Sequence, residues 1–251
     1  MTPKYEITDI QHPDPDYLKL FRIRALRDIP RFNIKAGDLG GYTVHQGYLS
    51  HEGDCWIGGD ACVLGTVQVY GNAHIYGNAR VHDNARIFGN SQIFGDVRIS
   101  GHARVSGHAR VSGDAVVTEK ARVSGHARVS GDAWVFGAAR VSGSAQIYDN
   151  AQIFRYARVY ENARVFNNAR VSGNVKVSGN VQVSGNAAVT GDMILIEGMR
   201  ISGGRCNITS PAQIYYAAGI TAYFELNGIL RINGTSPDTE YHETLARLKL
   251  T

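Results

Sequence analysis

The chain has 251 residues, of which 43% are apolar and 19% charged, with 29 glycines and six prolines. This apolar content excludes a disordered chain, and the absence of any run of about 18 apolar residues excludes a membrane-spanning helix. The formal net charge of +4 permits an anionic partner. Three cysteines and no apolar leader segment predict a reduced, cytoplasmic protein without a disulfide framework.

Residues 1–52 are predicted to form a small N-terminal β cap. Tyr5–Ile10 and Leu18–Leu26 have the composition of strands. The AGDLGG segment (Ala36–Gly41) has two glycines after an acidic residue, as some phosphate-binding loops do. It lacks the glycine spacing and the following helix of such a loop, so we expect a turn in the cap.

A six-residue repeat begins at Gly53 and continues without an insertion, as in GNAHIY, GNARVH and GHARVS. The fifth position, from Ile57 to Ile201, is Val, Ile or Leu in all 25 hexads, and the third, from Cys55 to Ala187, is Ala, Val, Ser or Cys in all 23. Positions three and five of a strand point to the same side. Each hexad is therefore predicted to be a short strand with two inward residues, followed by a turn at Gly and Asn.

A six-residue strand and turn cannot bury its apolar face alone, so successive hexads must wind around a shared core. The fold class predicted is all-β, a single-stranded parallel β-helix of 26 hexads over residues 53–208. Three hexads per coil give a prism roughly 40 Å long at ~4.8 Å per coil. The sequence has no proline between Pro30 and Pro211, as a continuous backbone ladder requires.

Residues 209–251 are predicted to form a C-terminal cap of strands and a short helix. Asn227-Gly228 is a hairpin signal, and Ser236 followed by Pro237 is typical of a helix start. Such a cap would cover the last exposed strand edge.

The repeats resemble the hexapeptide-repeat, left-handed β-helix superfamily, which includes many acyl- and acetyltransferases. More narrowly, IRALRDI (Ile23–Ile29) and AGDLGG followed by GNARVxG repeats resemble the YdcK-type proteins of bacteria and phages. The resemblance implies left-handed winding. The superfamily's enzymes place their site between the prisms of a trimer, with a projecting loop and a histidine that deprotonates the acceptor for attack on acyl-CoA.

Catalytic residues are not predicted in the repeats. No hexad between 53 and 202 contains an insertion, and the histidines there fall at outward positions two, four and six. His108 and His126 are eighteen residues apart, so they should stack in neighbouring coils. They are a candidate metal pair without an obvious third ligand, and a solvated surface is the alternative.

Position four carries a candidate anion-binding column, one residue per coil on one face. Its members are Arg86, Arg104, Arg122, Arg140, Arg158 and Lys176. Residues 84–191 hold 13 Lys or Arg and six Asp or Glu, so the repeats carry the basic excess. A polyanion would relieve the repulsion along the column. The alternative is a solvated face on which repeat duplication copied arginine.

A candidate interface lies on outward positions of another face. It comprises Val116, Trp134, Phe136 and Phe154. Exposed aromatic residues that cluster favour self-association. Aromatic stacking along the ladder, or a ligand site, are the alternatives. For the pairs Tyr76 with Phe94 and Tyr148 with Phe166, stacking alone is a sufficient explanation.

These features predict a rigid, non-catalytic binding or structural module. It would form a homo-oligomer, either a dimer or a trimer, and engage an anionic macromolecule or a host protein, with no membrane contact. An acyl-CoA-dependent acyltransferase is one alternative, and a phage-type protein that sequesters a host macromolecule or a nucleotide signal is another. No cofactor is predicted, except acyl-CoA under the transferase alternative.

Overall fold

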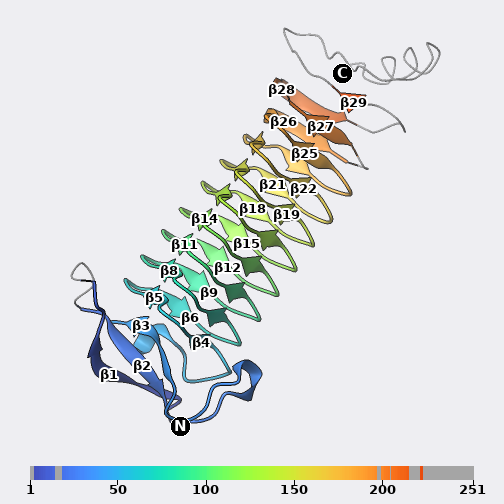
Figure 1. Cartoon of the computed structure of the whole chain (residues 1–251). Coiled ribbons are helices and arrows are strands. Elements are labelled where there is room, and N and C mark those ends of the chain that lie inside the picture. Colours follow the sequence, from blue (N-terminus) through green and yellow to red (C-terminus); the bar gives the residue numbers. More distant parts are fainter. Residues whose placement is uncertain (1–2, 15–18, 197–198, 204, 215–220, 223–251) are drawn as a thin grey trace, which may run out of the picture.

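The computed structural model describes residues 3–14, 19–196, 199–203, 205–214 and 221–222. Within them the chain is an all-β parallel solenoid of about nine turns, and its only helices are two short 3-10 segments, η2 (Pro30–Phe32) and η3 (Gln46–Tyr48). Figure 1 shows the turns stacked as successive rungs, with the N-terminal residues at one end. The predicted parallel β-helix is confirmed.

An antiparallel sheet precedes the solenoid, formed by β1 (Tyr5–Gln11), β2 (Phe21–Ala25) and β3 (Leu39–Thr43). The two strands predicted in this region correspond to β1 and β2. β3 then pairs in parallel with β5 of the solenoid, where Tyr42 lies opposite Cys62. The N-terminal sheet is therefore continuous with the first coil.

The AGDLGG segment is a turn only in its first half. Gly40 and Gly41 lie inside β3, which corrects the expectation of a turn throughout. A Cβ on either glycine would lie 2.5 Å from a carbonyl oxygen of the first coil, that of Ile57 or Ala61. These glycines let β3 lie directly on the solenoid.

The solenoid has three faces, and each strand pairs with the strand eighteen residues away in the next coil. The first face contains β5 (Cys62–Val63), β8 (Arg80–Val81), β11 (Arg98–Ile99), β14 (Val116–Val117), β17 (Trp134–Val135), β20 (Gln152–Ile153) and β23 (Arg170–Val171). The second contains β6 (Gln68–Val69), β9 (Arg86–Ile87), β12 (Arg104–Val105), β15 (Arg122–Val123), β18 (Arg140–Val141), β21 (Arg158–Val159) and β24 (Lys176–Val177). The third contains β4 (Trp56–Ile57), β7 (His74–Ile75), β10 (Gln92–Ile93), β13 (Arg110–Val111), β16 (Arg128–Val129), β19 (Gln146–Ile147), β22 (Arg164–Val165), β25 (Gln182–Ser184), β27 (Arg200–Ser202) and β29 (Thr221–Ala222).

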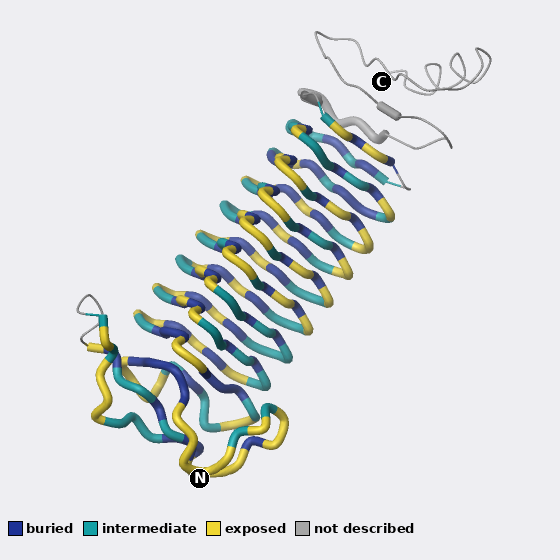
Figure 2. Tube along the Cα trace, in the orientation of Figure 1, coloured by how far each residue is buried: buried dark blue, intermediate teal, exposed yellow. Residues whose placement is uncertain are grey.

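The core inside the prism consists mainly of small and β-branched side chains. Figure 2 shows buried residues recurring between exposed ones along the coils. Residues at hexad positions three and five, such as Ala103 and Val105, are fully buried, whereas Arg104 between them is exposed. This alternation is what a strand with one buried face requires. The predicted inward positions are confirmed.

Glycine is favoured at the corners because the coils stack closely there, although some corners carry another residue, such as Asp83. Gly107 has a φ of +68°, and a Cβ on it would lie 2.9 Å from the backbone nitrogen of Gly125 in the next coil. One residue later, His108 N donates to Gly125 O at 2.7 Å, so the ladder continues around the corner. A left-handed backbone in such close contact favours a residue without a side chain.

The eighteen-residue register ends after Ile201. β26 (Ala188–Leu195) is one long strand that joins the first and second faces, and it pairs with β28 (Arg205–Ile214). Ala188 lies opposite Arg205, seventeen residues away, so the hexad predicted at 203–208 is out of register. The predicted hairpin at 227–228 and the helix from 236 lie outside the described residues. No helix in the described part of the chain is long and apolar enough to span a membrane.

His74 differs from the other outward histidines because the N-terminal segment covers it. Its ring stacks on Phe32 of η2 at 4.1 Å and on Tyr76 at 4.4 Å. Burial lowers the pKa of His74 to about 4. The expectation that this histidine is a solvated surface residue is therefore wrong, and η2 is fixed on the third face.

Because the half-buried position of His74 lowers its pKa, we expect the protein to lose stability on acidification. Its folded pKa, about 4, lies below the ordinary value of 6.5, so the unfolded chain binds the proton first as pH falls. The free energy of unfolding should fall between pH 6.5 and pH 4, by at most about 3 kcal/mol. Urea unfolding across this range measures it.

The matched variants are His74→Phe, which keeps an aromatic ring between Phe32 and Tyr76, and His102→Asn at an exposed position. In His74→Phe the free energy of unfolding should depend less on pH in this range. In His102→Asn its pH dependence should stay as in the wild type. An equal slope in the wild type and His74→Phe would contradict the assignment to His74.

Candidate binding surfaces of the solenoid

The predicted basic residues stand in one unbroken column on the second face. We call Arg86, Arg104, Arg122, Arg140, Arg158 and Lys176 the arginine column. Each member is paired in register with the next along parallel strands β9 to β24. The five arginines are exposed and Lys176 is half-buried. Neighbouring backbones are therefore about 4.8 Å apart, and the six cationic side chains start from the same side of the prism.

The arginine column has no ion-pair partner within the described residues. The ion pairs there are Arg22 with Asp60, Arg24 with Glu6, Lys35 with Asp28 and His82 with Asp83. None of them involves a column residue. No described carboxylate therefore lies within ion-pair distance of the column.

Several acidic residues of the solenoid lie at its corners, where they bind backbone amides. Each has a positive φ and accepts a hydrogen bond from the backbone amide eighteen residues later. The bonds are Gly101 N to Asp83 Oδ2 (2.8 Å), Asn167 N to Asp149 Oδ2 (3.0 Å) and Gly179 N to Glu161 Oε2 (2.6 Å). The amide of Gly101, and then the side chain of His82, lowers the pKa of Asp83. These carboxylates stabilise the corners rather than pair with the column.

The four predicted interface residues are also brought together, and we call them the aromatic surface. Val116 lies opposite Trp134 on adjacent strands of the first face. The Trp134 ring meets Phe136 edge to face at 6.3 Å, and Phe136 stacks on Phe154 at 4.9 Å. Trp134 is 46% exposed. Stacking therefore orders the phenylalanines and leaves much of the indole in solvent.

His108 and His126 stack as their spacing predicts. Their ring centroids are 4.8 Å apart with an interplanar angle of 7°. In the described part of the chain, no group of three or more His, Cys, Asp or Glu side chains is placed to hold a metal ion. The neighbour of the pair is the amide of Asn90, 3.4 Å from His108 Nε2.

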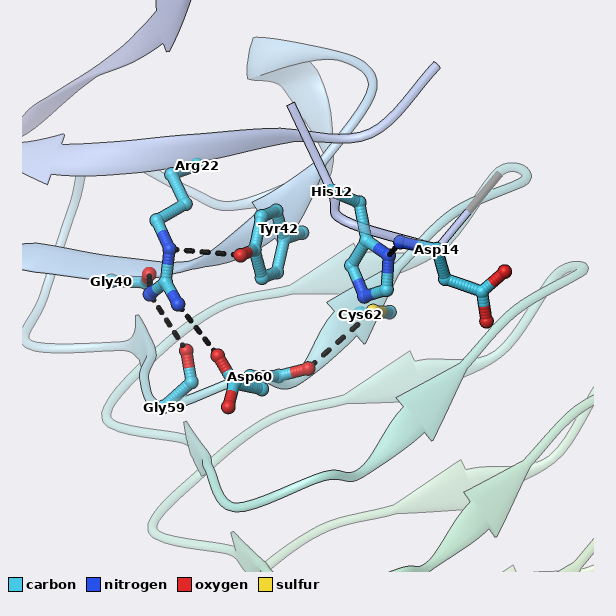
Figure 3. Close-up of polar contacts among 8 residues, drawn as sticks. All are labelled: His12, Asp14, Arg22, Gly40, Tyr42, Gly59, Asp60 and Cys62. Atoms are coloured by element: carbon cyan, nitrogen blue, oxygen red, sulfur yellow. Dashed lines mark hydrogen bonds and ion pairs between the residues drawn. The ribbon is translucent and has the colours of Figure 1, made fainter. Parts of the chain in front are cut away.

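The described thiols are buried and protonated. Cys62 lies under the N-terminal residues His12 and Tyr42 (Figure 3). Burial raises the pKa of its thiol to about 11. Burial also raises the pKa of Cys55, although Lys4 Nζ lies 3.2 Å from its sulfur. A thiol with a raised pKa is a poor nucleophile.

The polar contacts around Cys62 are those of a joint between two parts of the chain. Arg22 donates to Asp60 Oδ1 at 2.6 Å, to Gly40 O at 2.8 Å and to the hydroxyl of Tyr42 at 3.0 Å (Figure 3). These bonds tie β2 and β3 to the first corner of the solenoid. Their geometry fits a structural role.

Sequence reasoning missed a basic hollow on the third face. The hollow lies beside η2, has a volume of about 190 Å³ and is lined by Arg31, Asn90, Gln92, His108, Arg110, His126 and Arg128. A signal was present, because the stretch ARVSGHARVSGDA occurs twice, at 103–115 and at 121–133. This duplication places Arg128 one coil after Arg110, and His126 one coil after His108.

The stacked hexads and the parallel ladders define the class of the protein, a β-solenoid built from six-residue repeats. The YdcK β-solenoid repeat model matches residues 67–83, 103–119, 121–137, 145–161, 157–173 and 169–185. Residues within 67–185 thus form YdcK-type β-solenoid repeats, as the sequence resemblance implies. A search of curated proteins finds no match to the chain.

Proposed function

We propose that the solenoid is a rigid, non-catalytic binding module whose arginine column engages an anionic macromolecule. The observation that carries the proposal is a column of six in-register cations without an ion-pair partner in the described residues. Left-handed winding, closed by end caps at 1–52 and 209–251, belongs to the same proposal.

The electrostatics of the column favour a polymeric anion. Two unit charges about 4.8 Å apart repel by about 0.9 kcal/mol at the dielectric constant of water, before salt screening. A chain of phosphate or sulfate groups laid along the column adds attractive interactions that outweigh this repulsion, and it releases its own counterions. Five steps of about 4.8 Å span about 24 Å, which is long enough for several such groups.

The scaffold contributes by holding the cations in place before binding. The backbone amide of each arginine in the column donates to a carbonyl of the next coil, such as Arg104 N to Ala121 O at 2.9 Å. Only side-chain rotations need to be ordered on binding, and this lowers the entropic cost of association.

Charge reversal in the column tests the proposal. The triple variant Arg104→Glu, Arg122→Glu and Arg140→Glu should bind heparin and a short single-stranded DNA at least about tenfold more weakly. The slope of log K against log salt should also become much shallower, since each lost phosphate contact removes about 0.7 from it. Retention on immobilised heparin and the fluorescence anisotropy of the labelled DNA measure these effects.

A matched triple variant carries the same charge change on the other two faces, at Arg98, Arg164 and Arg170. All three are exposed, as the column residues are. It should keep most of the affinity and most of the salt slope. Equal losses of affinity in both triple variants would mean that net charge alone accounts for binding. If the wild type showed no salt-dependent retention on heparin, the proposal would be wrong.

Self-association through the aromatic surface is a second proposed property. Along the first face, Val116, Trp134 and Gln152 lie between Arg98 and Arg170, so an uncharged centre is flanked by charged ends. Depletion of charge at the centre of an aromatic patch is typical of protein interfaces. A second copy of the chain would bury the exposed face of Trp134 in a dimer or a trimer.

The substitution Trp134→Lys tests this interface. A lysine at the centre would put a charge into the buried contact and remove its main aromatic anchor. The mass from light scattering should fall to that of a smaller species, and Trp134→Phe should keep the larger one. An unchanged mass in Trp134→Lys would remove this surface from consideration.

The acyltransferase alternative is supported by the superfamily resemblance alone, and fold resemblance is weak support for a reaction. An acyl-transfer assay with acetyl-CoA and a small amine acceptor separates it from the binding module. We expect no release of free CoA above the spontaneous rate. Transfer of the acetyl group to the acceptor would replace the non-catalytic proposal.

A further inference from the structure

The basic hollow on the third face contains cationic and neutral polar groups and no carboxylate. Arg110 and Arg128 lie opposite each other on β13 and β16, and the stacked rings of His108 and His126 stand beside them. Arg31, Arg110 and Arg128 form no ion pair within the described residues. The acids nearest in sequence to Arg110 and Arg128, at positions 114 and 132, stand at the next corner of the solenoid. The acid nearest in sequence to Arg31 is Asp28, which pairs with Lys35 at 3.0 Å. The hollow therefore favours an anion.

The N-terminal segment closes one end of this hollow. Arg31 donates from Nη2 to Asn90 Oδ1 at 2.8 Å, and the next residue, Phe32, stacks on His74 at 4.1 Å. These two contacts hold the Arg31 side chain against the third face. Three guanidinium groups from two parts of the chain thus meet at one place.

The size of the hollow limits what it can hold. About 190 Å³ is below the roughly 300–1,000 Å³ of pockets that enclose a whole organic ligand. It suits a phosphate or diphosphate group, whose oxygens accept paired hydrogen bonds from guanidinium groups. The rest of such a ligand would have to lie outside it.

A second hollow adjoins the first and shares Arg128 with it. Its volume is about 350 Å³, and its lining includes Ser130, Gln146, Tyr148 and Asp149. The register of β16 and β19 places Ser130 next to Tyr148 in the neighbouring coil. The acidic side chain that lines this hollow, Asp149, already accepts a hydrogen bond through Oδ2 from Asn167 N at 3.0 Å.

The ring of Tyr148 gives this second hollow an aromatic wall. One face of the ring stacks on Phe166 at 4.9 Å, in the direction of the C-terminus. In the opposite direction lies the short side chain of Ser130, which also lines this hollow. A planar ring placed over Ser130 would continue the stack that Tyr148 and Phe166 begin.

We propose that the two hollows together bind a nucleoside phosphate. Its phosphate groups lie among Arg31, Arg110 and Arg128, and its base stacks on Tyr148. The site is on a different face from the arginine column, so it stands independently of polyanion binding.

Calorimetry with ADP and with inorganic pyrophosphate tests the proposal on the full chain. Arg110→Gln should weaken both ligands about tenfold or more, since each loses a charge-assisted bond to phosphate. Glutamine already occupies the equivalent positions of the third face at Gln92 and Gln146, so the fold should tolerate the change. The matched control is Arg164→Gln, which removes the same charge from the same face outside both hollows.

The variant Tyr148→Ser separates the base from the phosphates. It should weaken ADP about fivefold or more and leave pyrophosphate unchanged, because only the nucleotide stacks on the ring. Serine occurs at the equivalent positions 112 and 130, and thermal unfolding checks that the fold is kept.

Three results would overturn the proposal. They are no saturable binding of ADP by the wild type, equal losses in Arg110→Gln and Arg164→Gln, and an ADP affinity that Tyr148→Ser leaves unchanged. Heparin retention of the wild type is measured in parallel, so failure of the nucleotide site and failure of the arginine column are seen separately.

Discussion

Backbone hydrogen bonds between neighbouring coils, which hold residues eighteen apart in register, are the constraint on which the whole solenoid depends. Trp134 N, for example, donates to Ala151 O at 2.8 Å, and the corner amide of His108 donates to Gly125 O at 2.7 Å. An unpaired amide inside such a stack is costly, so proline is excluded and every hexad must keep its length. The same ladder brings the corners so close that a left-handed glycine such as Gly107 is favoured there.

This constraint converts sequence spacing directly into spatial contact. Outward residues eighteen apart lie about 4.8 Å apart, and a substitution that recurs once per coil becomes a column on one face. The aromatic stack of Phe136 and Phe154 at 4.9 Å and the histidine stack at 4.8 Å follow from the same arithmetic. Acids at the corners, such as Asp83, bond to amides of the next coil, and within the described residues the arginine column has no ion-pair partner.

The repeat therefore made the fold and the surface columns predictable from the sequence alone. The inward positions, the arginine column and the aromatic surface were all found by counting in sixes. What counting could not find depends on the N-terminal segment, which lies outside the repeat. Phe32 covers His74, and Arg31 reaches Asn90, a residue 59 positions away. Neither contact has a periodic signal, so only the three-dimensional structure shows the hollow on the third face.

Periodic and non-periodic surfaces suit different ligands. The arginine column presents a cation at every step, so it favours a polymer that also repeats. At the third-face hollow the periodicity is broken twice. The histidines occur in two coils only, between Asn90 and Ser144, and Arg31 closes one end. A surface whose repeat is interrupted in this way defines a single position along the prism, and a single position selects one small molecule rather than a chain.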